Sequence, residues 1–235
     1  MILLILFLLF QSTPASCETL PDWFIPLRDA VYEQKLSTAQ IELLYREVSS
    51  KAKSVLSGAE QQIMLSRCEY FMGRAYSSEE KKAEAIKHFN EGIKYAENAM
   101  KVKESAQAWV MQAENISQSC LVQPTSYAIA NGLKVEKYSK NAIVINPRYA
   151  AAQIMVAARW VFAPSPLHNY PRAIQMLTDI INNSDMEKDD KFNVYMAMGY
   201  VYLKQKNNVN ANLWFAKASE IYPSNKYLQS LTEGI

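Results

Sequence analysis

One stretch near the C-terminus constrains the fold more than any other part of the chain, because residues 190–223 carry small, aromatic and proline residues at regular intervals. These positions are filled by Tyr195, Met198, Gly199, Tyr202, Ala211, Phe215, Ala218 and Pro223. Small residues such as Gly199 and Ala211 let two helices approach closely, and Pro223 ends the second helix. A single helical hairpin cannot bury its apolar face alone, so the pattern predicts further hairpins upstream.

The same spacing occurs a second time, in residues 59–100. Its positions are filled by Met72, Gly73, Tyr76, Ala85, Phe89 and Gly92, with Glu69 where the C-terminal copy has Tyr195. The pattern resembles the tetratricopeptide (TPR) repeat, a helical hairpin of about 34 residues with the signature W-x2-L-G-x2-Y, A-x3-F, A and P. The resemblance implies that each copy is a pair of antiparallel helices.

Two weaker copies lie between these repeats. Residues 104–147 carry Trp109, Ala113, Ile116, Ala142 and Pro147. This copy is about ten residues longer than the standard spacing, and we expect the excess at 119–126, where Pro124 forbids a continuous helix. Residues 149–183 carry Val156, Ala157, Trp160, Ala173, Leu177 and Ile180. A proline-rich loop separates their two helices, and Pro171 is expected in the first turn of the second one.

The remaining segments are expected to cap the array, and the N-terminal one is either a cap or a degenerate repeat. Residues 17–57 contain two helical patterns, at 21–34 and 37–57, and Ser37 is a plausible N-cap of the second. Residues 224–235 form one short capping helix. With four hairpins at 59–100, 104–147, 149–183 and 188–223, we predict an all-α solenoid of TPR-like hairpins that winds into a right-handed superhelix.

The first sixteen residues have the features of a secretory signal peptide. The apolar run MILLILFLLF at residues 1–10 is about half the length that a membrane-spanning helix needs, and small and polar residues follow it. Two outcomes remain open, namely plain secretion and lipidation of Cys17 as the new N-terminus. Either outcome places the protein in the periplasm or elsewhere in the cell envelope, as a membrane-anchored lipoprotein if Cys17 is lipidated.

The sequence contains no pattern that indicates an enzyme. The net charge is +2, which gives no reason to expect nucleic acid as the main partner. No nucleophile motif, phosphate loop or metal-binding spacing is present, so we predict no catalytic residue, no metal site and no cofactor. Of the two histidines, we interpret His88 as a surface residue, whereas His168 lies in the proline-rich loop.

The concave face is the expected binding site. In the TPR family, the second, fifth and ninth positions of each first helix line this face. The resemblance carries that role to Arg67, Tyr70, Arg74, Gln107, Val110, Glu114, Ala151, Ile154, Ala158, Asn193, Met196 and Tyr200. Its N-terminal half is polar, and Arg67 or Arg74 can bind a carboxylate. Its C-terminal half is apolar, and the alternative for that half is core under the C-terminal cap.

Two narrower resemblances bear on function. Residues 158–177, ARWVFAPSPLHNYPRAIQML, resemble the T component of TRAP-type solute transporters, which are bacterial envelope lipoproteins. That resemblance implies a trimer, a periplasmic solute-binding protein as partner and a path for an apolar ligand. Residues 168–223 also resemble the TPR domain of eukaryotic regulators of microtubule dynamics, through Ala211, Trp214, Lys217 and Ala218.

Two functions are therefore expected. The first is a non-enzymatic scaffold in the bacterial cell envelope that binds a partner protein or peptide in its concave groove. The alternative is a transporter accessory lipoprotein that handles a small apolar ligand together with a solute-binding protein. The N-terminal signal favours a bacterial protein under both hypotheses, and neither expects the chain to bind nucleic acid.

Overall fold

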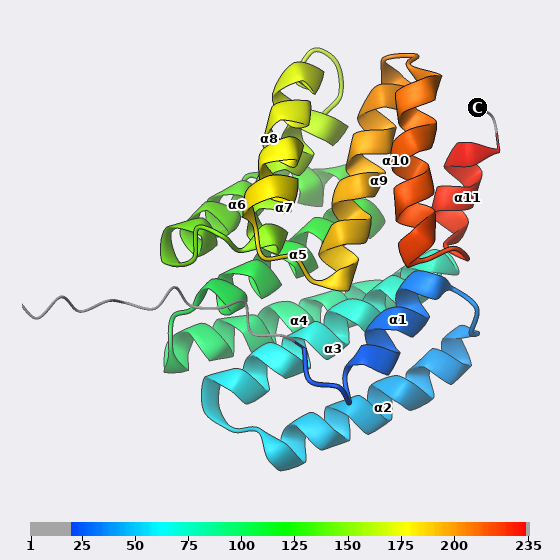
Figure 1. Ribbon diagram of the computed structural model, residues 1–235. Coiled ribbons are helices and arrows are strands. Elements are labelled where there is room, and N and C mark those ends of the chain that lie inside the picture. The colour runs from blue at the N-terminus through cyan, green and yellow to red at the C-terminus, as the bar shows by residue number, and fades with distance from the viewer. Residues whose placement is uncertain (1–19, 234–235) are drawn as a thin grey trace, which may run out of the picture.

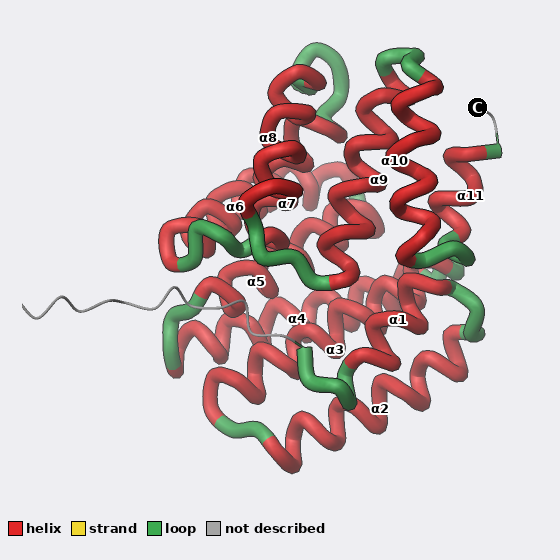
Figure 2. The backbone as a smooth tube through the Cα atoms, viewed as in Figure 1, coloured by secondary structure: helices red, strands yellow, loops and turns green. Residues whose placement is uncertain are grey.

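The computed structural model describes residues 20–233, and this part of the chain contains helices and no strand (Figures 1 and 2). The helices are α1 (Ile25–Glu33), α2 (Thr38–Val55), α3 (Gly58–Ser78), α4 (Lys82–Val102), α5 (Ala106–Val122), α6 (Thr125–Ile145), α7 (Ala150–Phe162), α8 (Tyr170–Asn183), α9 (Lys188–Lys204), α10 (Asn208–Ile221) and α11 (Lys226–Thr232). The predicted all-α class is confirmed. The predicted signal peptide and Cys17 lie outside the described residues.

The helices pack as successive hairpins in two layers. Each of the pairs α1–α2, α3–α4, α5–α6, α7–α8 and α9–α10 is in contact, and each first helix also contacts the first helix of the next hairpin. The hairpins turn relative to one another, so that α9 and α10 stand steeply across α3 and α4 (Figure 1). The first helices α3, α5, α7 and α9 therefore share one surface, which we call the inner face.

The small residues of the repeated pattern are sites of close packing. In α3, a side chain on Gly73 would collide with the ring of Phe89 from α4. In α9, a side chain on Gly199 would collide in the same way with the ring of Phe215 from α10. The glycine of the first helix thus makes room for the aromatic ring of the second helix in both hairpins.

Three predicted helix boundaries are confirmed. The Ser37 side chain accepts a hydrogen bond from the Gln40 backbone N–H and forms a capping box at the start of α2. Pro171 lies in the first turn of α8, where its missing N–H leaves no hydrogen bond unmade. Pro124 separates α5 from α6, as its lack of an N–H requires.

The structure corrects the prediction for the third hairpin. The excess residues were expected around 119–126, yet α5 continues to Val122 and α6 begins at Thr125. The extra length is therefore helical, and α6 has 21 residues against 13 in α7. As a result, the beginning of α6 extends past the end of α7.

The interpretation of His88 as a surface residue is wrong. His88 Nδ1 lies 2.6 Å from Oε2 of the buried Glu69, and its ring stacks on Tyr76 with centroids 5.3 Å apart. The Tyr45 hydroxyl donates a 2.6 Å hydrogen bond to Oε1 of the same carboxylate. Glu69 replaces an aromatic residue of the pattern at a buried position because partners from α2 and α4 satisfy both of its oxygens.

The N-terminal helix connects the two ends of the array. Phe24, Leu27 and Tyr32 are buried in the same apolar core as Phe192 and Tyr222 from the last hairpin. The Tyr32 and Tyr222 rings stack with centroids 4.9 Å apart. The predicted C-terminal capping helix takes part in this contact, because Asn225 Nδ2, just before α11, donates a 2.8 Å hydrogen bond to the Tyr32 carbonyl.

Candidate functional site: the inner face

The structure brings several of the predicted groove residues together. Arg67 and Tyr70 from α3, Glu114 from α5 and Ala151 from α7 line one small cavity. The other lining residues are Phe71, Tyr149, Glu187, Asp189 and Asp190. The inner face is therefore a real convergence of four hairpins, and its centre is polar.

This cavity is too small for a metabolite. Its volume is about 30 Å³, which is room for about two water molecules, whereas ligand pockets usually measure about 300 Å³ or more. Among residues 20–233, no group of three or more histidine, cysteine or carboxylate side chains is arranged to hold a metal ion. The centre of the inner face thus holds charged side chains of the chain itself.

Helix α1 covers one end of the inner face. The Arg74 guanidinium lies 4.3 Å from the centre of the Tyr32 ring, and Asn193 Nδ2 donates a 2.8 Å hydrogen bond to the Tyr32 hydroxyl. Met196, one turn after Asn193 on α9, is buried in the same core as α1. The predicted groove positions at this end therefore bind the chain's own N-terminal helix.

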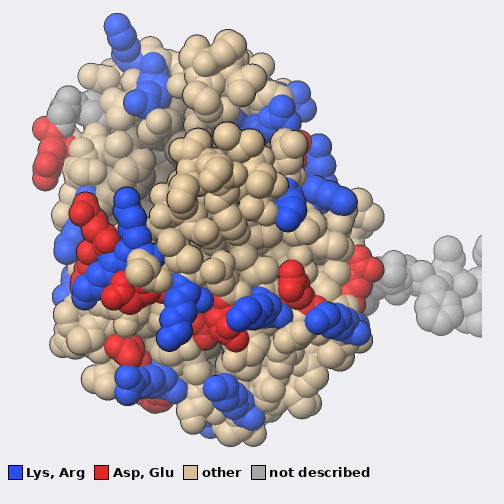
Figure 3. All heavy atoms as spheres, turned by 180° about the vertical axis from the view of Figure 1, so that it is seen from behind, with Lys and Arg blue, Asp and Glu red and all other residues tan. Residues whose placement is uncertain are grey.

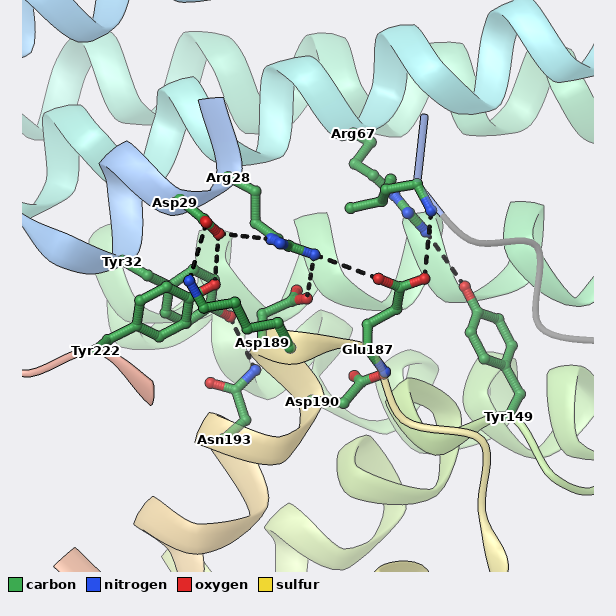
Figure 4. A network of polar contacts seen from close by, with 12 residues as sticks. Arg28, Asp29, Tyr32, Arg67, Tyr149, Glu187, Asp189, Asp190, Asn193 and Tyr222 are labelled. Atoms are coloured by element: carbon green, nitrogen blue, oxygen red, sulfur yellow. Dashed lines mark hydrogen bonds and ion pairs between the residues drawn. The ribbon is translucent and has the colours of Figure 1, made fainter. Parts of the chain in front are cut away.

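A network of charged groups fixes α1 to the start of α9 (Figure 4). Arg28 on α1 is only 4% exposed, and its Nη1 lies 3.3 Å from Glu187 Oε2 and 3.7 Å from Asp189 Oδ1. The neighbouring Asp29 accepts hydrogen bonds from Lys188 Nζ at 2.9 Å and from the Tyr222 hydroxyl at 2.8 Å. Residues about 160 positions apart in the sequence are thereby held together.

The electrostatics of this network favour the charged forms of Arg28 and Asp29. Burial alone raises the pKa of Asp29, but hydrogen bonds from Lys188, Tyr222 and Arg28 outweigh it, and the pKa is lowered overall. Burial lowers the pKa of Arg28, but Tyr222, Asp29 and Asp189 raise it above its ordinary value. Both groups are therefore ionised at neutral pH and hold α1 in place.

Two other acids of the inner face have raised pKa values, which favour their neutral forms. Burial raises the pKa of Glu114 to about 7, against the opposing effect of Arg67 and Arg74. Burial and the neighbouring Asp189 raise the pKa of Asp190 well above its ordinary value. Asp190 also accepts a 3.1 Å hydrogen bond from the Glu187 backbone N–H in the capping box that begins α9.

That Arg67 or Arg74 forms an ion pair with a carboxylate of a partner stays a prediction. In the folded chain, Glu114, Asp189 and Glu187 raise the pKa of Arg67 together with Tyr149, against the lowering effect of burial. Arg67 Nη2 also donates a 3.3 Å hydrogen bond to the Tyr149 hydroxyl. The acids that face Arg67 thus come from the same chain.

The opposite end of the inner face is more open. Ile154 and Ala158 follow Ala151 by one and two turns of α7, so the three residues lie on one face of that helix, and each of them is only partly buried. Tyr200 is partly buried on α9, two turns after Asn193, and its ring lies 5.0 Å from that of Phe162. Small and apolar groups thus line this end, which we call the open end.

Two predicted groove positions on α5 differ in exposure. Val110 is fully buried in a core with Ala106 and Met111, whereas Gln107 is partly exposed. Val110 therefore packs between helices and does not present its side chain to a ligand.

Sequence reasoning missed the residues that come from α1 and from the segment before α9. Arg28, Asp29 and Tyr32 fall in the segment that is expected as a cap or a degenerate repeat. Asp189 falls at the start of the last predicted repeat, and Glu187 lies just before it. The E-K-D-D run at 187–190 predicts a helix N-terminus, but it does not show that this terminus faces α1. A search against protein-family models and a search of curated proteins both found no match to this chain.

Proposed function

We propose that the chain is a TPR-like helical solenoid that acts as a non-enzymatic scaffold and binds a segment of a partner protein at the open end of its inner face. The N-terminal apolar run supports a place in the bacterial cell envelope, with Cys17 as a candidate lipid anchor. The partner segment is apolar, because Ile154, Ala158 and Tyr200 would contact it. The partner segment binds beside α1, and α1 keeps its position when the partner is bound.

The TPR assignment is supported by the two glycine–phenylalanine contacts. Gly73 with Phe89 and Gly199 with Phe215 occupy the same positions of the repeated pattern and pack in the same way. The first helices also contact one another in chain order, as stacking of repeats requires.

One observation carries the functional proposal, namely that the inner face already binds a helix. Helix α1 inserts Tyr32 between Arg74 and Asn193, which are two of the predicted groove positions. Tyr200, two turns after Asn193 on α9, is only partly buried, and so are Ile154 and Ala158 on α7. A helix or extended segment laid along α7 and α9 would continue the mode of binding that α1 uses.

No observation favours the transporter alternative. An apolar ligand needs an apolar cavity, whereas the cavity at the centre of the inner face is lined by Arg67, Glu114 and three further carboxylates. We therefore propose the scaffold function alone.

Site-specific photo-crosslinking tests the proposal. A photoreactive amino acid is placed at Ala158 or Tyr200 in the full chain, and at the exposed Lys140 on α6 as a control. We expect one partner to be cross-linked from Ala158 and Tyr200 but not from Lys140. The variant Tyr200→Glu should lose this partner, because the new charge would have to be buried in the contact.

A matched variant controls for general damage. Leu43 on α2 is an exposed apolar residue outside the inner face, and Leu43→Glu should retain the partner. Cross-links from Lys140 alone, or equal recovery of the partner by Tyr200→Glu and Leu43→Glu, would overturn the proposal.

A further inference from the structure

The ends of two neighbouring hairpins expose apolar side chains in regions without charge. The sequence has no Asp, Glu, Lys or Arg from Asn115 to Leu133, which covers the α5–α6 turn. Within this stretch, Leu121 is 74% exposed and both Ile129 and Leu133 are 77% exposed. Ile129 and Leu133 lie at the beginning of α6, which extends past the end of α7, and Leu121 lies in the last turn of α5.

The next hairpin continues this surface. Residues 160–171, around the α7–α8 turn, also contain no Asp, Glu, Lys or Arg, and Phe162 and Leu167 are 53% and 60% exposed. Because α5 and α7 contact each other as first helices of consecutive hairpins, their C-terminal ends lie at the same edge of the array. We call Leu121, Ile129, Leu133, Phe162 and Leu167 the apolar edge.

Basic side chains surround the apolar edge. They are Lys134 and Lys137 on α6, Arg172 on α8, and Lys204 and Lys206 at the α9–α10 turn, and none of them has an ion pair within the described residues. The nearby Glu136 is already paired with Lys140 and Arg159. Seen from behind, the molecule shows a broad convex area without charged groups, and lysine and arginine side chains border it, together with carboxylates on one side and below (Figure 3).

Aromatic side chains lie between the apolar and basic groups. The Arg172 guanidinium lies 4.2 Å from the centre of the Trp160 ring, and Lys204 Nζ lies 5.1 Å from the centre of the Tyr200 ring. Apolar residues next to tryptophan, tyrosine and free cations are the combination that binds the interface of a bilayer.

We propose that the apolar edge binds an anionic lipid surface. A peptide needs a groove, whereas this surface is convex, and a lipid interface can deform around protruding side chains. The leucine, isoleucine and phenylalanine side chains would enter the headgroup region. The five unpaired cations would attract anionic headgroups, and salt would weaken that attraction. This binding is distinct from any anchor at Cys17, and it adjoins the proposed partner site, because the ring of Phe162 lies 5.0 Å from that of Tyr200.

Hydrogen exchange of the full chain with vesicles locates the contact. The probe is vesicles of phosphatidylcholine with about one third phosphatidylserine, compared with phosphatidylcholine alone. We expect slower amide exchange in residues 121–133 and 160–169 with the anionic vesicles only. Slower exchange confined to residues 1–19, or no change at either hairpin end, would overturn the proposal.

Paired variants test the same claim by affinity. Ile129→Asp with Leu167→Asp should lower the apparent affinity for anionic vesicles by about tenfold or more, since both side chains leave the lipid. Leu43→Asp with Val55→Asp changes two exposed apolar residues elsewhere and should leave the affinity unchanged. Equal effects of both pairs would contradict the proposal, as would a concentration-dependent dimer that only the first pair abolishes.

Discussion

At the scale of single residues, Glu114 is an acid whose burial opposes its charge. Its pKa in the folded chain is raised to about 7, first by burial, whereas its ordinary value is 4.5. The stability that its protonated form contributes is present at low pH and is lost as the pH rises through about 7. The raised pKa thus predicts that ionised Glu114 destabilises the fold above neutrality.

The variant Glu114→Gln tests this by comparison with the natural chain. We expect the free energy of unfolding of the variant, relative to that of the natural chain, to rise by about 2 kcal/mol between pH 5 and pH 8. Urea denaturation at both pH values measures the difference. A difference that stays constant with pH would show that Glu114 does not titrate in this range.

The sequence predicted part of this residue-scale chemistry. Arg67, Tyr70 and Glu114 were placed on the inner face by their repeat positions, and the structure brings them together at one cavity. Their partners Glu187 and Asp189 were not predicted, because the repeat pattern assigns roles within helices and says nothing about the short connection before α9.

At the scale of helices, the two glycines Gly199 and Gly132 should respond oppositely to the same substitution. In Gly199→Ala, the new methyl group collides with the Phe215 ring, which should cost about 1–3 kcal/mol of the free energy of unfolding. In Gly132→Ala, the methyl group meets nothing, and the higher helix propensity of alanine should add about 0.5–1 kcal/mol.

Chemical denaturation of the two alanine variants beside the natural chain measures both changes. An unchanged stability of Gly199→Ala would contradict the packing described for α9 and α10, and a loss of stability in Gly132→Ala would contradict the open space beside Gly132 on α6.

Helix positions were easier to predict than helix lengths. Capping and proline residues such as Ser37, Pro124 and Pro171 mark helix ends through hydrogen bonds that are local in sequence. The extra length of the third hairpin could not be assigned, since a longer spacing between Ala113 and Ala142 is compatible with a long loop or with longer helices. The position of His88 was predicted wrongly for a related reason, because Tyr45 from another hairpin contacts both its ring and its partner Glu69.

At the scale of the whole molecule, the decisive feature is the contact of α1 with the last hairpin. The sequence predicts a superhelical array of hairpins, with residues 17–57 as an N-terminal cap or a degenerate repeat. The structure instead places Arg28 against Glu187 and Asp189, and Tyr32 against Tyr222. No local pattern in the sequence encodes such a contact, since it depends on how far the hairpins turn relative to one another.

Native-state hydrogen exchange of α1 tests this arrangement most directly. In the natural chain, we expect the amides of α1 to exchange as slowly as those of α3 and α9. Arg28→Ala leaves the partly buried Glu187 and Asp189 without their shared partner, which costs about 1.5–3 kcal/mol, and should speed exchange in α1 and the first turn of α9 together by at least about tenfold. Lys35→Ala, which removes an exposed ion pair with Glu33, should change neither. Fast exchange of α1 in the natural chain, with α3 and α9 still protected, would contradict the account.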